Sequence, residues 1–342
     1  MLKGLQFMAY TSLLKKETLG IATTLNMPQG AGNAFVYEPK GKEKGLIITL
    51  TGFAMNGYKD KRIAVVNNAF TKMGYRVITP QIKTIDQLLI HPTAIDELKE
   101  AITSIVADPI LNPLQLQPAI FAPSFTAGIA AIAVAELPPN TVSALCLLGT
   151  FSDFKTTIQF ALTNPNNADD YGMHILLKNF LKYDITDDIH ILEIIDTALA
   201  DNGLKRKPAL LPGLLERAPA ASRALYQKIL SDVAYREELI LRAWTNIPGF
   251  DQWQYRLDLA KHAHKISCKV ALIHGAADAV IPAEQSVLLY NLLQANNPQV
   301  HLVLSNLLDH GDLKITFKIF SEVAQLARAF AFFINETPAP SH

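Results

Sequence analysis

The feature that most constrains the fold is a series of short apolar runs that alternate with stretches of helical periodicity. Runs that are apolar at nearly every position and rich in β-branched residues are typical of parallel strands covered on both faces. Helices between such strands predict right-handed crossovers, and therefore an α/β protein with a mostly parallel sheet flanked by helices. The runs are "GLIITLTG" (45–52), "YRVITP" (75–80), "PAIFAP" (118–123), "TVSALCLLGT" (141–150), "CKVALIHG" (268–275) and "VHLVLS" (300–305).

The segments outside these runs add an edge to the sheet. Residues 19–26 and 34–39 alternate apolar and polar side chains and are separated by the turn residues "MPQGAGN". This pattern predicts an antiparallel pair at one edge. Among the helices, one is expected to have Thr93 as its N-terminal cap, because Asp96 three residues later completes a capping pattern.

The alternation stops between residues 151 and 264, where helical periodicity continues without a convincing strand. We therefore expect residues 1–150 and 265–342 to form one core and residues 151–264 to form a helical cap or lid. Because the insertion lies between two strands, it is expected on the rim where the strands end.

Composition narrows the possible partners. Lys and Arg together number 31, as do Asp and Glu, so the formal charge is zero. No block of like charge is present to follow a phosphate backbone or an anionic membrane, and no nucleic-acid partner is expected. No signal peptide and no apolar run of transmembrane length occur, which predicts a cytoplasmic protein without an integral membrane segment. Cys146 and Cys268 lie in apolar, strand-like segments and are expected to be inert buried thiols.

Three residues with complementary chemistry follow predicted strands. Ser124 follows the run at 118–123, Asp278 follows 268–275, and His310 follows 300–305. In an open parallel sheet the ligand crevice lies beyond the carboxyl ends of the strands. A serine hydroxyl becomes a nucleophile when an imidazole accepts its proton, and a carboxylate orients the imidazole. The sequence thus predicts Ser124, His310 and Asp278 as a catalytic triad.

Two backbone N–H groups are candidates for an oxyanion hole. The turn after Ser124 directs the N–H of Phe125 toward a developing oxyanion, where the helix N-terminus adds a favourable dipole. A second donor is the N–H of Phe53 in the loop after residues 45–52, since Gly52 permits a close backbone approach.

Several alternatives stay open at this point. Asp153 follows another strand and rivals Asp278 as the acid, while Asp278 has a second possible role as the cap of a helix near Pro282. Other histidines, namely His91, His174, His190 and His301, do not follow the appropriate strand. No metal is expected, because His262 and His264 are two residues apart and no further ligand set accompanies them. No cofactor is expected either, because neither Walker spacing nor a G-x-G-x-x-G segment opening a helix occurs.

At these residues the chain resembles α/β-hydrolases, and the resemblance extends from Gly45 to Phe333 with the cap as its variable part. In that family the nucleophile lies in a G-x-S-x-G elbow and the acid often lies in a G-x-x-D-x-x-x-P-like segment. The segment "GAADAVIP" implies the acid role for Asp278, and "LDHGD" implies the base role for His310. "TGF" (51–53) stands where many members have His-Gly and an apolar residue, which implies that Phe53 is an oxyanion residue.

The elbow departs from the family pattern, because Ala122 and Thr126 occupy the flanking glycine positions. A β-branched Thr126 side chain must find room beside a tight turn. The elbow is similar to the Ala-x-Ser-x-Ser of bacterial acyltransferase-thioesterases, which release fatty acids from acyl carriers. "GFA" (52–54) and "HGDL" (310–313) add to that likeness.

Together these features predict a serine hydrolase for a carboxylic ester or thioester with an apolar acyl group, acting through an acyl-enzyme. The alternative is a protein of the same fold that binds a small ligand without turnover, as crowding at the elbow would favour. The sequence leaves open the acyl length, the leaving group, the final acyl acceptor and the oligomeric state.

Overall fold

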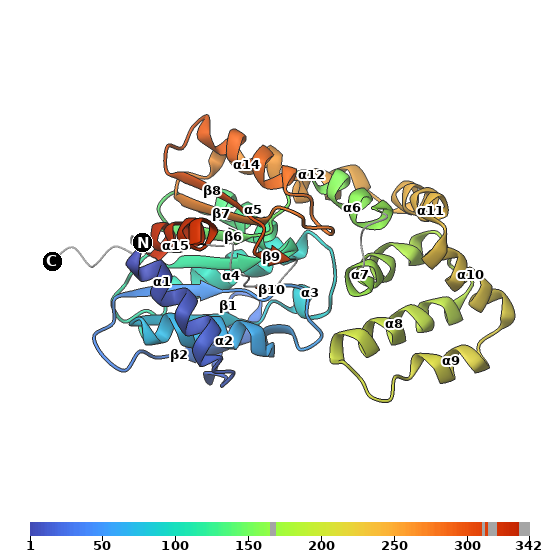
Figure 1. Cartoon of the computed structure of the whole chain (residues 1–342), viewed down its shortest axis with the longest axis horizontal. Coiled ribbons are helices and arrows are strands. Elements are labelled where there is room, and N and C mark those ends of the chain that lie inside the picture. The colour runs from blue at the N-terminus through green and yellow to red at the C-terminus, as the bar shows by residue number, and fades with distance from the viewer. Residues whose placement is uncertain (165–168, 310–311, 314–319, 335–342) are drawn as a thin grey trace.

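The computed structural model describes residues 1–164, 169–309, 312–313 and 320–334. Its centre is an eight-stranded sheet in the order β1-β2-β4-β3-β5-β6-β7-β8 (Figure 1). All pairs from β4 to β8 in this order are parallel. This confirms the predicted mostly parallel sheet. The parallel strands are β3 (Gly45–Thr49), β4 (Tyr75–Pro80), β5 (Ala119–Pro123), β6 (Ala144–Leu148), β7 (Lys269–Gly275) and β8 (Val300–Ser305).

The predicted antiparallel pair forms the edge of this sheet. It consists of β1 (Ile21–Met27) and β2 (Gly30–Tyr37), and β2 also pairs antiparallel with β4. The strands extend further than the sequence predicts, because Met27 pairs directly with Gly30. A turn this tight needs a residue with positive φ, and Gly30 has a φ of +119°.

The strands alternate their side chains between two apolar layers. In β3, Leu46 and Ile48 join the layer formed with α4 (Thr93–Ala107) and α5 (Phe125–Glu136), while Ile47 joins the opposite layer. That opposite layer contains α1 (Leu2–Ala9), α2 (Lys61–Lys72) and α15 (Phe320–Ile334). Helices on both faces explain why these strands are apolar at nearly every position.

The predicted cap at Thr93 is wrong. Thr93 is the first residue of α4, and Pro92 before it has helical angles of φ −58° and ψ −24°. A side-chain cap requires an extended residue ahead of the first turn. The Thr93 hydroxyl instead lies 2.9 Å from Nδ1 of His91 and 3.1 Å from Oγ1 of Thr84. Asp96 accepts a hydrogen bond from Arg256 at 2.8 Å.

Between β6 and β7 the described residues form helices and no strand. Part of this stretch has a hydrophobic cluster of its own, which includes Leu177, Ile191, Ile229 and Leu239. Figure 1 shows α7 to α11 beside the sheet domain rather than over either face of the sheet. The helices are α6 (Phe154–Thr163), α7 (Asp170–Phe180), α8 (Ile189–Leu204), α9 (Leu211–Arg217), α10 (Ala220–Ser231), α11 (Val233–Asn246), α12 (Phe250–Leu257) and α13 (Leu259–His262), with 3₁₀ turns η3 (Leu181–Tyr183) and η4 (Ala263–Lys265).

The remaining elements are short or terminal. A π-helix, η1 (Tyr10–Leu14), follows α1, and the connections contain η2 (Gly57–Lys59), α3 (Lys83–Asp86) and α14 (Glu284–Gln294). A two-stranded ribbon, β9 (Leu308–Asp309) and β10 (Asp312–Leu313), follows β8. Within the described part of the chain, no helix has the length and apolar character needed to cross a bilayer.

Candidate active site

Ser124 occupies a sharp turn between β5 and α5. Its backbone angles are φ +57° and ψ −144°, a region that non-glycine residues rarely adopt. The turn is held by neighbouring backbone groups. The Ser124 N–H donates to the carbonyl of Leu148 at 2.6 Å, and the Ser124 carbonyl accepts from Ala127 at 2.9 Å. Backbone strain of this kind persists only where the surrounding structure fixes it, and it is concentrated at functional sites.

The residues that replace the elbow glycines are accommodated. Ala122 and Thr126 are fully buried. The Thr126 hydroxyl donates to the carbonyl of Pro123 at 2.7 Å, which bridges the turn from strand to helix. On the other side Gly52 lies next to the elbow, because a Cβ added to it would be in ordinary van der Waals contact with Cβ of Ser124, at 3.7 Å. The β-branched residue therefore fits at this position and ties the turn together.

The loop after β3 lies against the elbow. The Phe53 ring stacks on Phe125 with 5.4 Å between ring centroids, and Phe125 is the first residue of α5. Phe125 stacks in turn on Phe151 at 4.6 Å. The N-terminus of α5, with its partial positive charge, thus lies next to Ser124.

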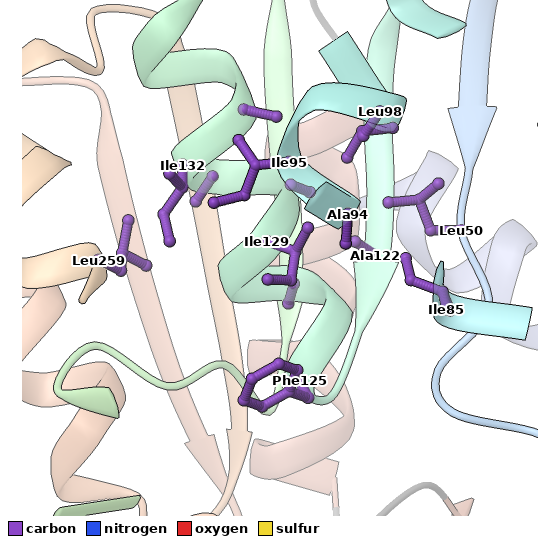
Figure 2. Close-up of a cluster of buried hydrophobic side chains, with 14 of the residues drawn as sticks. Leu50, Ile85, Ala94, Ile95, Leu98, Ala122, Phe125, Ile129, Ile132 and Leu259 are labelled. Atoms are coloured by element: carbon purple, nitrogen blue, oxygen red, sulfur yellow. The ribbon is translucent and has the colours of Figure 1, made fainter. Parts of the chain in front are cut away.

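The hydrophobic core fixes the position of α5. Figure 2 shows Phe125, Ile129 and Ile132 along one side of α5, with Ile95 and Leu98 of α4 in the same cluster. All five side chains are buried. The elbow therefore rests on a helix that cannot move without disturbing the centre of the core.

Asp278 follows β7 on the same edge of the sheet. Its Oδ1 accepts hydrogen bonds from the N–H groups of Val280 at 2.9 Å and Ile281 at 3.0 Å, and the residue is 8% exposed. Its Oδ2 faces the end of β6, since an added Cβ on Gly149 would lie 3.7 Å away. Strands β5, β6 and β7 are neighbours, so Asp278 and Ser124 follow strands separated by one strand.

His274, which no sequence pattern indicates as a site residue, is fully buried in β7. Its Nε2 lies 2.9 Å from the carbonyl of Ile281, and its Nδ1 lies 2.6 Å from Oγ of Ser286. A carbonyl only accepts, which assigns the proton to Nε2 and makes Ser286 the donor to Nδ1. The same Nε2 lies 3.5 Å from Oδ2 of Asp278. His274 thus links β7, before the turn that contains Asp278, to Ile281, after that turn.

Asp153, the rival acid, has a different set of contacts. It is the N-cap of α6, where Oδ1 accepts from the N–H of Thr156 at 2.8 Å and from its hydroxyl at 2.7 Å. Its own N–H donates to Gln285 at 2.7 Å. These contacts show that Asp153 caps the N-terminus of α6.

His310 lies outside the described residues, but the chain that leads to it is described. Ala276 donates its N–H to the carbonyl of Ser305 at 2.9 Å. A Cβ added to Gly275 would lie only 2.6 Å from the carbonyl oxygen of Leu308. The segment after β8 therefore passes directly over the residues that begin the Asp278 turn.

The helices after β6 contact both loops of this edge. Nδ2 of Asn164, at the end of α6, donates to the carbonyl of Ala279 at 3.0 Å. On the other side, a Cβ added to Gly203 in α8 would lie 2.4 Å from Met55 and 2.6 Å from Tyr171. Met55 belongs to the loop after β3, so α8 contacts the loop that contains Phe53, and the end of α6 contacts the loop that contains Asp278.

Other reactive groups lie away from this edge or are suppressed by burial. Burial raises the pKa of Cys268 to about 12 and that of Cys146 still further, so neither thiol ionises at neutral pH. Among the described residues, no group of three His, Cys, Asp or Glu side chains is placed to hold a metal ion.

Comparison with solved structures identifies the fold. No family model and no curated protein match the sequence. Solved structures are similar. They include a Pyrococcus horikoshii acylaminoacyl peptidase (TM-score 0.51, 12% identity, 93% of this chain and 40% of that one). A Mycobacterium tuberculosis puromycin-hydrolyzing peptidase gives a TM-score of 0.53 and 14% identity over 92% of this chain and 38% of that one.

A Pyrococcus furiosus esterase, Pf2001, matches over nearly its whole length, with a TM-score of 0.52, 10% identity and coverage of 94% of this chain and 93% of that one. This chain spans about 40% of each of the two peptidases. At these identities the likeness concerns the fold. Together with the strand order and the strained turn at Ser124, it shows that the chain has the α/β-hydrolase fold.

Proposed function

We propose that the protein is a serine hydrolase that cleaves a carboxylic ester or thioester with an apolar acyl group. The observation that carries the proposal is the backbone of Ser124, which is held at φ +57° and ψ −144° beside the N-terminus of α5. A turn that only connects a strand to a helix does not require this strain. A nucleophile presented at the carboxyl edge of the sheet does.

The reaction proceeds in two steps. Oγ of Ser124 attacks the acyl carbon while His310 takes its proton, and Asp278 stabilises the imidazolium that forms. The N–H groups of Phe53 and Phe125 stabilise the oxyanion. His310 then protonates the departing alcohol or thiol, which leaves an acyl-serine. His310 then takes a proton from water, and the resulting hydroxide attacks the acyl-serine. His310 gives this proton to the Ser124 oxygen as the ester breaks, which releases the carboxylic acid.

The position of Asp278 beside the chain that follows β8 favours it over Asp153 as the acid, since each of the two carboxylates accepts local hydrogen bonds through Oδ1. Asp278 uses Oδ1 for its own turn, while Oδ2 lies on the side of Gly149 and His274. Asp153 is engaged as a helix cap. The path of the chain at Leu308, over the start of the Asp278 turn, supports His310 as the partner of Asp278.

Apolar side chains of the loops after β3 and β7 and of α7 support an apolar acyl group. Met55, Tyr171 and Val280 are partly buried against the main core beside the elbow, as is Phe53. We propose that residues 151–264 act as a cap and that these four apolar side chains border the acyl group. Burying an acyl chain against such side chains stabilises the complex by about 0.8 kcal/mol per methylene.

The binding-protein alternative rests on a crowded elbow. The buried Thr126 side chain and its hydrogen bond to Pro123 give that alternative no specific support. The two functions differ in a simple observable, because a binding protein returns an ester unchanged and a hydrolase releases the acid.

The test is a series of acyl esters and thioesters of increasing chain length, with free acid as the readout. We expect turnover that increases with apolar chain length and falls at least about 10³-fold in Ser124→Ala and Asp278→Asn. Asp153→Asn and the exposed Ser231→Ala are the matched controls and retain activity. Acid release that survives in Ser124→Ala would refute the mechanism, and loss in Asp153→Asn with retention in Asp278→Asn would reassign the acid.

A further inference from the structure

The inner side of the first helix is fixed against the sheet domain. Gly4, Phe7 and Met8 of α1 are buried. A Cβ added to Gly4 would lie 1.8 Å from the carbonyl oxygen of Ala327 in α15, so the two helix backbones are in direct contact. The Phe7 ring stacks on Phe70 with 4.4 Å between centroids. This packing determines which side of α1 faces solvent.

The outer side of α1 and η1 is also apolar. Leu2 is 80% exposed, Leu13 is 81% exposed and Leu5 is 37% exposed. An isolated exposed leucine is ordinary on a protein surface. Three within one short helical segment are more than usual, because surface helices normally place polar residues on the solvent side, as Lys3 and Gln6 are here. We call Leu2, Leu5 and Leu13 together the apolar stripe.

Cations surround this stripe. Lys3, Lys15 and Lys16 are exposed, and Nζ of Lys72 lies 5.2 Å from the ring centroid of Tyr10 in η1. Glu17 is the only acidic residue among the first twenty, and it pairs with Lys61 at 3.4 Å. The face is therefore positively charged, although the whole chain has no net charge.

We propose that the outer side of α1 and η1 is a peripheral binding face for a bilayer that contains anionic phospholipid. Leucines enter the boundary between headgroups and acyl chains, while the lysines pair with the lipid phosphates. A second copy of this chain is a poorer occupant, because a symmetric contact would oppose lysines with lysines. The proposal does not depend on the hydrolase activity. The face also lies away from the helices after β6, because in Figure 1 the N-terminus is on the opposite side of the sheet domain from helices α7 to α11.

The test is co-sedimentation of the full chain with vesicles of phosphatidylcholine alone and of phosphatidylcholine mixed with phosphatidylglycerol. We expect binding to the mixed vesicles only, weakened by salt. The double variant Lys15→Glu/Lys16→Glu is expected to reduce the partition coefficient at least about tenfold. Lys205→Glu/Lys207→Glu, a matched charge reversal in an exposed part of the α8–α9 connection, leaves it unchanged.

The apolar contribution is tested with Leu2→Ser/Leu13→Ser, which is also expected to reduce binding about tenfold or more. Ile110→Ser is the control, because Ile110 is 80% exposed in the loop after α4. Absence of binding, equal binding to both vesicle types, or equal losses in test and control variants would overturn the proposal. So would a lipid-free dimer that Leu2→Ser/Leu13→Ser dissociates, since that would show a self-interface.

Discussion

At the scale of single residues, Thr126 shows how a non-glycine elbow is stabilised. Its buried hydroxyl donates to the carbonyl of Pro123. We predict that Thr126→Val, which keeps the shape and leaves that carbonyl without its donor, lowers the free energy of unfolding by about 1–3 kcal/mol. Thr126→Ser keeps the donor and should lose less. Urea unfolding measures both, and a loss in Thr126→Ser as large as that in Thr126→Val would contradict the prediction that the hydrogen bond contributes more than the methyl group.

His274 is expected to position the acid. His274→Leu removes the donor to Ile281 and leaves Ser286 without its acceptor, so the turn around Asp278 loosens. We predict at least a tenfold slower reaction of Ser124 with a serine-directed probe. His274→Gln, which can again donate toward Ile281, should recover part of that rate. A variant that is less stable but reacts at the wild-type rate would limit His274 to a structural role.

Asp258 gives a pH dependence of stability. Burial, and next the nearby Asp153, raise its pKa from 3.8 to about 6. Between these values the folded chain holds a proton that the unfolded chain has lost, so stability falls as the pH rises from about 4 to about 6 and then levels off. We predict that Asp258→Asn raises the free energy of unfolding at pH 7 by up to about 2 kcal/mol and little at pH 4. Urea unfolding at both pH values checks this, and an equal change at both would contradict it.

At the residue scale, the sequence predicts positions better than roles. Ser124 and Asp278 follow apolar strands in the sequence, and both lie at the carboxyl edge of the sheet, while their catalytic roles stay predictions. His274 was missed because it lies inside an apolar strand, where the sequence gives no sign that the Asp278 turn folds back toward its ring. Nothing in the structure tests the role of His310, which lies outside the described residues.

At the scale of elements, two helical glycines predict opposite effects of one substitution. In α5, a Cβ added to Gly128 would lie 2.2 Å from the ring of Phe151. Gly128→Ala is therefore expected to displace that ring and lower the free energy of unfolding by about 1–3 kcal/mol. In α9, the nearest atom to an added Cβ on Gly213 is Nη1 of Arg217 at 3.9 Å. Gly213→Ala is expected to raise stability by about 0.5–1 kcal/mol. Thermal unfolding compares them, and changes of the same sign would contradict the packing argument.

The sequence predicts the elements of the sheet well because full burial leaves an unmistakable apolar pattern. It predicts their ends less well. The β1–β2 strands extend into residues that look like turn formers, since pairing across Met27 and Gly30 outweighs local preference. The start of α4 depends on His91 and Thr84, two neighbours whose contacts with Thr93 the local pattern does not reveal.

At the scale of the whole molecule, the folded structure brings together residues in ways that the overall composition and net charge do not reveal. A net charge of zero gave no reason to expect an anionic surface as a partner. Folding nevertheless brings Lys3, Lys15, Lys16 and Lys72 around one apolar stripe. Likewise, the long helical stretch after β6 is visible in the sequence, but its contacts at Met55 and Ala279 depend on the folded chain.

The central claim is that Ser124 is an activated nucleophile, and the intact mass of the protein after treatment with a fluorophosphonate tests it most directly. The probe reacts with an activated serine and does not require the natural substrate. We predict a single adduct on the wild type, none on Ser124→Ala, and a much slower reaction on His310→Ala. An unmodified, well-folded wild type, or an adduct that persists on Ser124→Ala, would contradict the account.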